Sequence, residues 1–192
     1  MKTIIQSCIL FILVIMITIT SISLVTHSAL KEELTTAVCK GAEQTMNMIF
    51  IYQVYPSGTS DEIIYDVLQN IILSKASDNE LVVNIYNKDG IDDRELDIEA
   101  IQTYTGLLGK KREVRYRVKM VVEESSSEDK KILSYIKYDK PDENAEISQT
   151  WKFSAASVSN IKSFLNSDDG KTPSLERNQR FFQRYGYCKT NG

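Results

Sequence analysis

The chain has 192 residues, 42% of them hydrophobic, and a formal net charge of -3 at pH 7. This length is sufficient for one domain with a hydrophobic core and a short additional segment. Because acidic and basic residues nearly balance, there is no electrostatic reason to expect nucleic acid as a partner, and we expect none.

The sequence begins with a long apolar run. No charged residue lies between Lys2 and Lys31, and about twenty apolar residues in a helix cross the ~30 Å hydrocarbon core of a bilayer. The run therefore predicts a transmembrane anchor at residues 1–28. The residues expected to contact lipid are Ile9, Phe11, Leu13, Ile15, Ile17 and Leu24.

A cleaved signal peptide is the alternative for this run. Its charged region would contain Lys2 alone, its apolar stretch exceeds the usual length of about 7–15 residues, and Thr26-His27-Ser28-Ala29 is a poor cleavage site. Retention as an uncleaved anchor is favoured. A short N-terminus before a long polar domain favours a single-pass protein of the cell membrane, with a cytoplasmic N-terminus and an extracytoplasmic C-terminal domain.

A helical pattern continues beyond the span, over residues 29–55. Its apolar residues recur three or four positions apart, and charged residues occupy the opposite face. No proline precedes Pro56, so we expect one helix from about Thr3 to Tyr52, roughly 75 Å long. The residues predicted to pack on the rest of the protein are Leu30, Leu34, Val38, Thr45 and Ile49.

Residues 56–192 are predicted to form an extracytoplasmic domain. Helical spacing predicts helices at 60–75 and 157–165 and a last helix between Ser174 and Tyr185. Alternating apolar residues predict strands at 81–86, 96–100, 114–122, 132–138 and 147–153. The expected fold class is α+β, with a long N-terminal transmembrane and amphipathic helix packed on an antiparallel β-sheet and extra short helices.

The most informative stretch is an expected hairpin around the loop Gly106-Leu107-Leu108-Gly109. The apolar residues of both strands have even numbers, so both sets face the core only if paired residue numbers sum to an even value. That register requires a loop with an odd number of residues, as in a type I turn followed by Gly109 in the left-handed conformation. On the outer face, acidic residues are expected opposite basic ones, namely Asp97 and Glu99 opposite Arg115, Arg117 and Lys119.

Residues able to carry out catalysis are scarce. The single histidine, His27, is interpreted as a polar residue at headgroup level, so no Ser/His or Cys/His couple is available. No His/Cys spacing predicts a zinc site. One turn carries four side chains with oxygen atoms that could bind calcium, those of Asn87, Asp89, Asp92 and Asp93. Their spacing departs from the calcium-loop pattern, so an acidic turn is the favoured interpretation. We predict no catalytic residue, no metal and no cofactor, and we do not expect an enzyme.

Two features leave alternatives open. Cys39 and Cys188 are candidates for a disulfide if the domain is extracytoplasmic, and two isolated thiols are the other interpretation. Arg177, Arg180 and Arg184 are expected on one face of the last helix. They form a candidate docking surface for a partner or for lipid, although a solvated basic face is the favoured interpretation.

The order of elements resembles that of type IV pilins and pseudopilins, in which an apolar helix continues as an amphipathic helix under an antiparallel sheet. A closer likeness is to the TadE-like single-pass minor pilus components of Gram-positive bacteria. It rests on the helix segment Leu34-Thr35-Thr36-Ala37-Val38 and on hairpin residues 95–100 and 109–114. The resemblance implies a non-enzymatic part in a pilus or secretion apparatus. Its implied partners are membrane lipid and other proteins, with homologous pilin-like subunits as candidates.

A second hypothesis belongs to another class. A span, helices and a curved antiparallel sheet with a late helix is also the layout of nuclear-transport-factor-like cones, which serve as surface or conjugation-apparatus scaffolds and binding proteins. A helix lying along the sheet favours the pilin-like hypothesis. A helix separate from a cup with an apolar mouth favours the cone.

Overall fold

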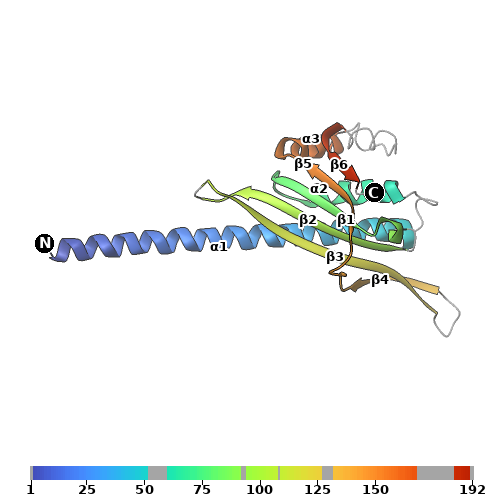
Figure 1. Cartoon of the computed structure of the whole chain (residues 1–192), viewed down its shortest axis with the longest axis horizontal. Helices are drawn as coiled ribbons and strands as arrows, with labels where there is room; N and C mark the ends of the chain where they lie inside the picture. The colour runs from blue at the N-terminus through green and yellow to red at the C-terminus, as the bar shows by residue number, and fades with distance from the viewer. Residues whose placement is uncertain are drawn as a thin grey trace.

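The computed structural model describes residues 2–51, 60–91, 94–107, 109–126, 132–167 and 184–190. Within these ranges, one long N-terminal helix packs on a six-stranded antiparallel sheet with short additional helices (Figure 1), which confirms the predicted α+β fold class. In chain order the elements are α1 (Lys2–Met46), α2 (Ser60–Ser74), β1 (Glu80–Tyr86), β2 (Glu95–Thr105), β3 (Lys111–Ser126), β4 (Ile132–Asp139), β5 (Ile147–Phe153), α3 (Ala155–Leu165) and β6 (Tyr187–Thr190).

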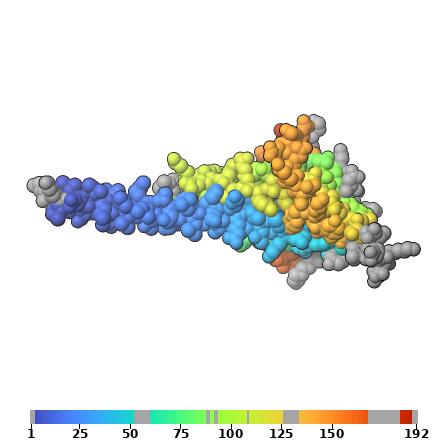
Figure 2. Space-filling model, turned by 90° about the horizontal axis from the view of Figure 1, so that it is seen from below, coloured from blue at the N-terminus to red at the C-terminus, as the bar shows by residue number. Residues whose placement is uncertain are grey.

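Helix α1 runs without interruption for 45 residues and continues into a π-helical turn, Asn47–Ile51. The absence of proline before Pro56 allows this length, because no backbone donor is lost along the way. The N-terminal half of α1 projects from one end of the domain, and the C-terminal half lies along it (Figures 1 and 2). The apolar run and the amphipathic segment are therefore parts of one helix.

The strands follow the order β4-β3-β2-β1-β5-β6. In the β2–β3 hairpin, Ile98 pairs with Val118, so paired residue numbers sum to an even value as predicted. The Gly106 N–H donates to the Lys110 carbonyl and the Gly109 N–H to the Gly106 carbonyl, both at 2.9 Å. Gly109 has a φ of 71°. The odd loop with a left-handed glycine is therefore confirmed.

The ion pairs on the outer face of this hairpin are diagonal rather than directly opposite. Asp97 lies across from Lys119 in the register, yet its carboxylate accepts two hydrogen bonds from Arg117, at 2.8 and 2.7 Å. Lys119 instead pairs with Glu95 at 2.9 Å. The diagonal positions are within reach of long basic side chains, so the predicted cross-strand pairing holds for Asp97, Arg117 and Lys119 with partners two residues away. It does not hold for Glu99, whose carboxylate accepts hydrogen bonds from Asn84 and Tyr86, or for Arg115, which pairs with Glu113 on its own strand.

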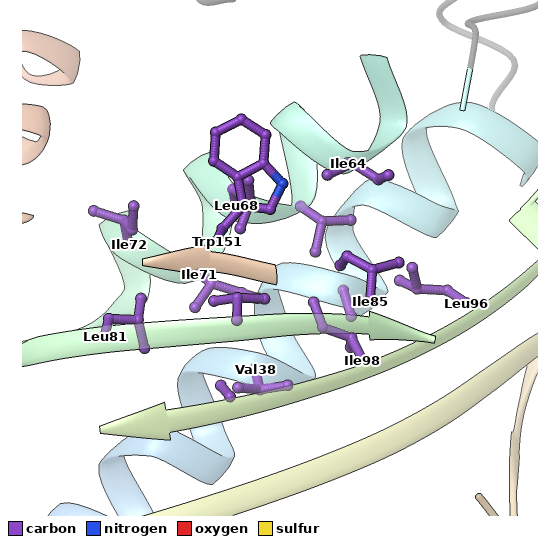
Figure 3. Packing of buried hydrophobic residues seen from close by; sticks show 14 of the residues in the cluster. Val38, Ile64, Leu68, Ile71, Ile72, Leu81, Ile85, Leu96, Ile98 and Trp151 are labelled. Atoms are coloured by element: carbon purple, nitrogen blue, oxygen red, sulfur yellow. The ribbon is translucent and has the colours of Figure 1, made fainter. Parts of the chain in front are cut away.

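The core lies between the sheet and the helices that cover its inner face (Figure 3). Helix α2 packs against α1 on one side and α3 on the other, which explains its wide apolar face. The single tryptophan, Trp151 of β5, meets Tyr65 of α2 edge to face, with ring centroids 5.5 Å apart. Trp151 is only 2% exposed, so it reports on the packing of α2 against the sheet.

The C-terminal part differs from the sequence prediction in one respect. Strand β6, which was not predicted, pairs with the edge of β5 through Trp151 and Cys188. Most of the predicted last helix, Ser174–Tyr185, lies outside the described residues.

Candidate membrane anchor and helix-docking interface

The N-terminal half of α1 presents apolar side chains on every side. None of the most apolar window of the helix is buried, and its mean hydropathy is 2.8. By length and composition the helix is a candidate membrane span, compatible with a single-pass protein, although a signal sequence has the same properties. The six residues predicted to contact lipid are all more than 40% exposed; they are Ile9, Phe11, Leu13, Ile15, Ile17 and Leu24.

Two hydroxyl groups within this apolar half, those of Thr18 and Thr20, are satisfied by the helix itself. The Thr18 hydroxyl donates to the Val14 carbonyl at 2.8 Å, and the Thr20 hydroxyl donates to the Met16 carbonyl. A hydroxyl that bonds one turn back needs no water. These two threonines therefore carry little cost in a lipid environment.

The C-terminal half of α1 buries the residues that the sequence predicted for packing. Leu34, Val38, Thr45 and Ile49 are each less than 9% exposed, and Leu30 is partly buried against the same core. Apolar residues therefore occur along the whole of α1, but they are exposed in its N-terminal half and buried in its C-terminal half. No other part of the described protein covers the N-terminal half of α1, whereas the sheet and α2 cover its C-terminal half.

Helices α1 and α2 approach closely at Gly41. A Cβ atom at this position would lie 2.7 Å from the backbone nitrogen of Ile71, which is shorter than real Cβ contacts. Beside it, the Thr45 hydroxyl donates to the Gly41 carbonyl at 3.0 Å and accepts a hydrogen bond from the Asn70 amide at 2.9 Å. Glycine is therefore required for the approach, and Thr45 supplies a polar contact between the helices.

Side-chain hydrogen bonds also join α1 to the sheet along its length. Arg112 of β3 donates to the Ser23 hydroxyl at 2.7 Å, and the Tyr104 hydroxyl lies 3.0 Å from His27 Nδ1. His27, expected at headgroup level, thus also contacts β2. Further along, the Cys39 sulfur lies 3.2 Å from the hydroxyl oxygen of Tyr116. Burial, followed by this contact, raises the pKa of Tyr116 to about 12.

A polar cluster connects α1 to the domain; Lys75 and Gln102 in it are buried, and Glu33 and Ser77 are partly buried. The Lys75 ammonium donates to the Gln102 side chain and lies 3.8 Å from the Glu33 carboxylate. The backbone N–H and the hydroxyl of Ser77 both donate to the same carboxylate, at 3.0 and 2.7 Å. Burial is the main cause that lowers the pKa of Lys75 to about 8.

A lysine of lowered pKa beside a serine hydroxyl also occurs in catalytic sites. In this protein the Lys75 side chain has no exposed surface, and the Ser77 hydroxyl accepts a hydrogen bond from Gln102 at 2.9 Å while donating to Glu33. The Lys75 ammonium is therefore inaccessible to a substrate, and the Ser77 hydroxyl is already engaged in both hydrogen bonds. We therefore interpret the cluster as a polar clamp between α1, β2 and the end of α2. The sequence did not reveal it, because its members are separated by up to 69 positions and share no pattern.

The outer face of the sheet is polar, and many of its charges are paired. The Arg117 guanidinium stacks over the Tyr86 ring at 3.6 Å in addition to its bond with Asp97. A groove of about 330 Å³ nearby has both acidic and basic residues in its lining, among them Lys119 and Asp142. Within the described ranges, no three His, Cys, Asp or Glu residues gather as metal ligands. Two members of the calcium candidate, Asp92 and Asp93, lie outside those ranges.

The two candidate disulfide partners are far apart. Cys39 and Cys188 are both free thiols. Cys39 contacts Tyr116 of β3, whereas Cys188 lies on β6, four strands away in the sheet order. At about 4.8 Å per strand this separation exceeds the reach of a disulfide. The disulfide interpretation is therefore wrong for this structure, and the two isolated thiols are what it contains.

The predicted basic docking surface is described only in part. Arg177 and Arg180 lie outside the described residues. Arg184 is exposed, with its guanidinium 5.7 Å from the centre of the Tyr185 ring. The structure therefore does not bring the three arginines together in a described surface.

Comparison of the chain with protein-family models, with curated proteins and with solved structures finds no match.

Proposed function

We propose that the protein is a single-pass membrane protein whose helix α1 both crosses the bilayer and supports an extracytoplasmic domain. The single observation that carries this proposal is the change in exposure along one helix. Its apolar N-terminal half has no protein cover, and its C-terminal half is buried against α2 and β3. A contiguous apolar surface of this size marks an interaction with lipid or protein.

The energetics favour lipid for the N-terminal half. Leu, Ile, Phe and Val each gain roughly 0.3–0.6 kcal/mol at the centre of a membrane helix, and the run contains no charged residue to oppose them. The span and the buried segment that packs on the domain are parts of one continuous helix, which contains no proline.

We further propose that the domain acts through protein–protein contacts as a pilin-like component, or as an assembly component of a pilus or secretion apparatus. Support comes from the position of α1, which lies along the sheet rather than apart from a cup (Figure 1). This arrangement favours the pilin-like hypothesis over the cone. The chain has no glycine before Gly41 and no glutamate before Glu32, so the proposal includes no prepilin-type cleavage.

Site-specific photocrosslinking in intact cells tests this assembly role. A photoreactive amino acid at Phe11 or Leu13 is expected to capture a second membrane protein, either another copy of this chain or a pilin-like subunit. The matched control is Val38, which is fully buried and is expected to give no intermolecular product. If the exposed positions crosslinked to lipid only, at every site in the span, the assembly role would be refuted while the anchor would stand.

A further inference from the structure

The β2–β3 hairpin extends beyond the body of the domain towards the N-terminal half of α1 (Figure 1). We define the hairpin tip as the described residues Gly106, Leu107 and Gly109–Arg112. Arg112 donates to Ser23, and Tyr104, which pairs with Arg112, contacts His27. These contacts fix the tip beside α1 at the first point where the helix meets the domain.

That point coincides with the end of the proposed span. About twenty residues, from Ile5 to Leu24, are enough at the rise of a helix to cross ~30 Å of hydrocarbon. Ser23 lies in the last turn of this stretch. A hairpin tip bonded to Ser23 is therefore held at the level where the helix leaves the hydrocarbon and enters the headgroup layer.

The residues of the tip fit this layer. Leu107 is 59% exposed at the apex, and the next residue in the sequence is also leucine. Three consecutive cationic residues follow, Lys110, Lys111 and Arg112, and all three are exposed. An exposed apolar side chain close to several cations is the combination found in segments that lie in a membrane interface.

The charge of the tip contrasts with that of the chain around it. The whole chain carries -3 and Lys2 is its only charge before Lys31, so the part beyond the span carries -4. Lys111 pairs with Glu80 at 3.2 Å, but both side chains are about half exposed or more, which makes the pair weak. Among the described residues, Lys110 has no carboxylate partner. The tip is a local positive region on an acidic domain.

We propose that the hairpin tip docks on an anionic phospholipid surface, with Leu107 in the interfacial region and the three cations facing headgroup phosphates. The inference rests on the proposed membrane anchor and adds a second point of contact with the bilayer. Cations within a Debye length of about 8–10 Å of an anionic surface are attracted to it. Two contacts, one through α1 and one through the tip, fix the orientation of the domain relative to the membrane.

Fluorescence of the full chain in vesicles tests the docking. We would compare Leu107→Trp with a matched control, Tyr135→Trp, in phosphatidylcholine vesicles with and without phosphatidylglycerol, adding brominated lipid as a quencher. Tyr135 is exposed and pairs with Glu123, twelve residues along β3 from Lys111. The native Trp151 is buried and serves as a constant background.

With phosphatidylglycerol present, the Leu107→Trp emission is expected to shift to shorter wavelength and to lose intensity with brominated lipid, whereas the Tyr135→Trp emission is expected to do neither. Adding Lys110→Gln and Lys111→Gln to the Leu107→Trp variant is expected to abolish most of the quenching by brominated lipid. If Leu107→Trp remains unquenched in vesicles from which the chain resists alkaline extraction, the docking is overturned while the anchor stands. If the chain is extracted, the proposed anchor itself fails.

Discussion

Replacing Gly41 with alanine tests whether α1 packs directly against α2. The new Cβ would lie 2.7 Å from the Ile71 nitrogen, 2.8 Å from Ile71 Cγ1 and 3.0 Å from Ile71 Cα. Two of these atoms belong to the backbone of α2, so a change of rotamer cannot relieve the overlap. The two helices must separate by several tenths of an ångström, and the contacts around the site must loosen.

Two effects of opposite sign determine the result of Gly41→Ala. Alanine in place of glycine within a helix stabilises by roughly 0.5–1 kcal/mol. Overpacking a well-packed core costs typically about 1–3 kcal/mol. Because the overlap is with backbone atoms, the cost is the larger effect, and we expect a net loss of about 0.5–2 kcal/mol in the free energy of unfolding.

The assay is urea unfolding of the full chain in detergent micelles, followed by the fluorescence of Trp151, which is buried against Tyr65 of α2. With a urea slope of about 1–3 kcal/mol per molar, the midpoint should fall by roughly half a molar. Gly106→Ala is the matched control, since its nearest atoms would be 3.5 Å away. A Gly41→Ala variant as stable as the wild type would show that α1 and α2 do not approach as described.

Three further predictions concern buried or partly buried charges. Arg117→Ala should lower the free energy of unfolding in urea by about 1–3 kcal/mol more than Arg115→Ala does. The reason is that Asp97 is buried and loses its partner in the first variant, whereas Arg115 is paired at the surface. Equal losses in the two variants would contradict the pairing of Arg117 with Asp97. Burial lowers the pKa of Lys75 in the folded chain to about 8, against 10.5 for an ordinary lysine. Between pH 8 and 10.5 the unfolded chain therefore binds more protons at this group than the folded chain does, and the free energy of unfolding rises with pH in that range. Lys75→Met should flatten that slope, measured between pH 8 and 9.5; an unchanged slope would assign the pH dependence to other groups. Burial, then the charge of Glu62, raises the pKa of Asp66 to about 6, so its contribution to stability is present below about pH 4 and is lost as the pH rises through 6. Asp66→Asn should therefore raise the unfolding midpoint at pH 8 and not at pH 3.5, and a gain at both values would point to another cause.

The sequence predicted those parts of the fold that depend on local pattern. The length of α1 followed from uninterrupted helical spacing without proline, and the strands followed from period-two alternation. The parity of the β2–β3 register followed from the alternation, because only an even sum of paired residue numbers places Ile98 and Val118 on the same face. In each case one strong constraint left few alternatives.

The parts that the sequence did not predict depend on contacts between distant residues. Nothing near Lys75 indicates that this lysine turns inward to meet Gln102 and Glu33, because a lysine at a helix end is usually solvated. The edge strand β6 is four residues long, too short for a clear alternation. The contact of His27 with Tyr104 likewise depends on where the hairpin ends relative to α1.

The two parts of the candidate site, the anchor helix and the hairpin tip, also differ in how far the sequence predicts them. The exposed and buried halves of α1 could be assigned from the placement of charged residues, since the first charge after Lys2 is Lys31. The sequence predicts only a hairpin loop here, and the hydrogen bond from Arg112 to Ser23 is what places the basic residues of that loop beside the span. The position of the hairpin tip beside the span, rather than the composition of its loop, is what suggests a contact with the membrane.

The central claim is that the apolar half of α1 stays on the protein and holds it in the bilayer. The most direct test is the intact mass of the protein recovered from membranes after alkaline carbonate extraction. We predict that the protein in the membrane pellet retains the apolar half of α1, so that its mass includes the run from Ile4 to Val25. Recovery of a soluble chain whose mass corresponds to a start near Ala29 would contradict the claim.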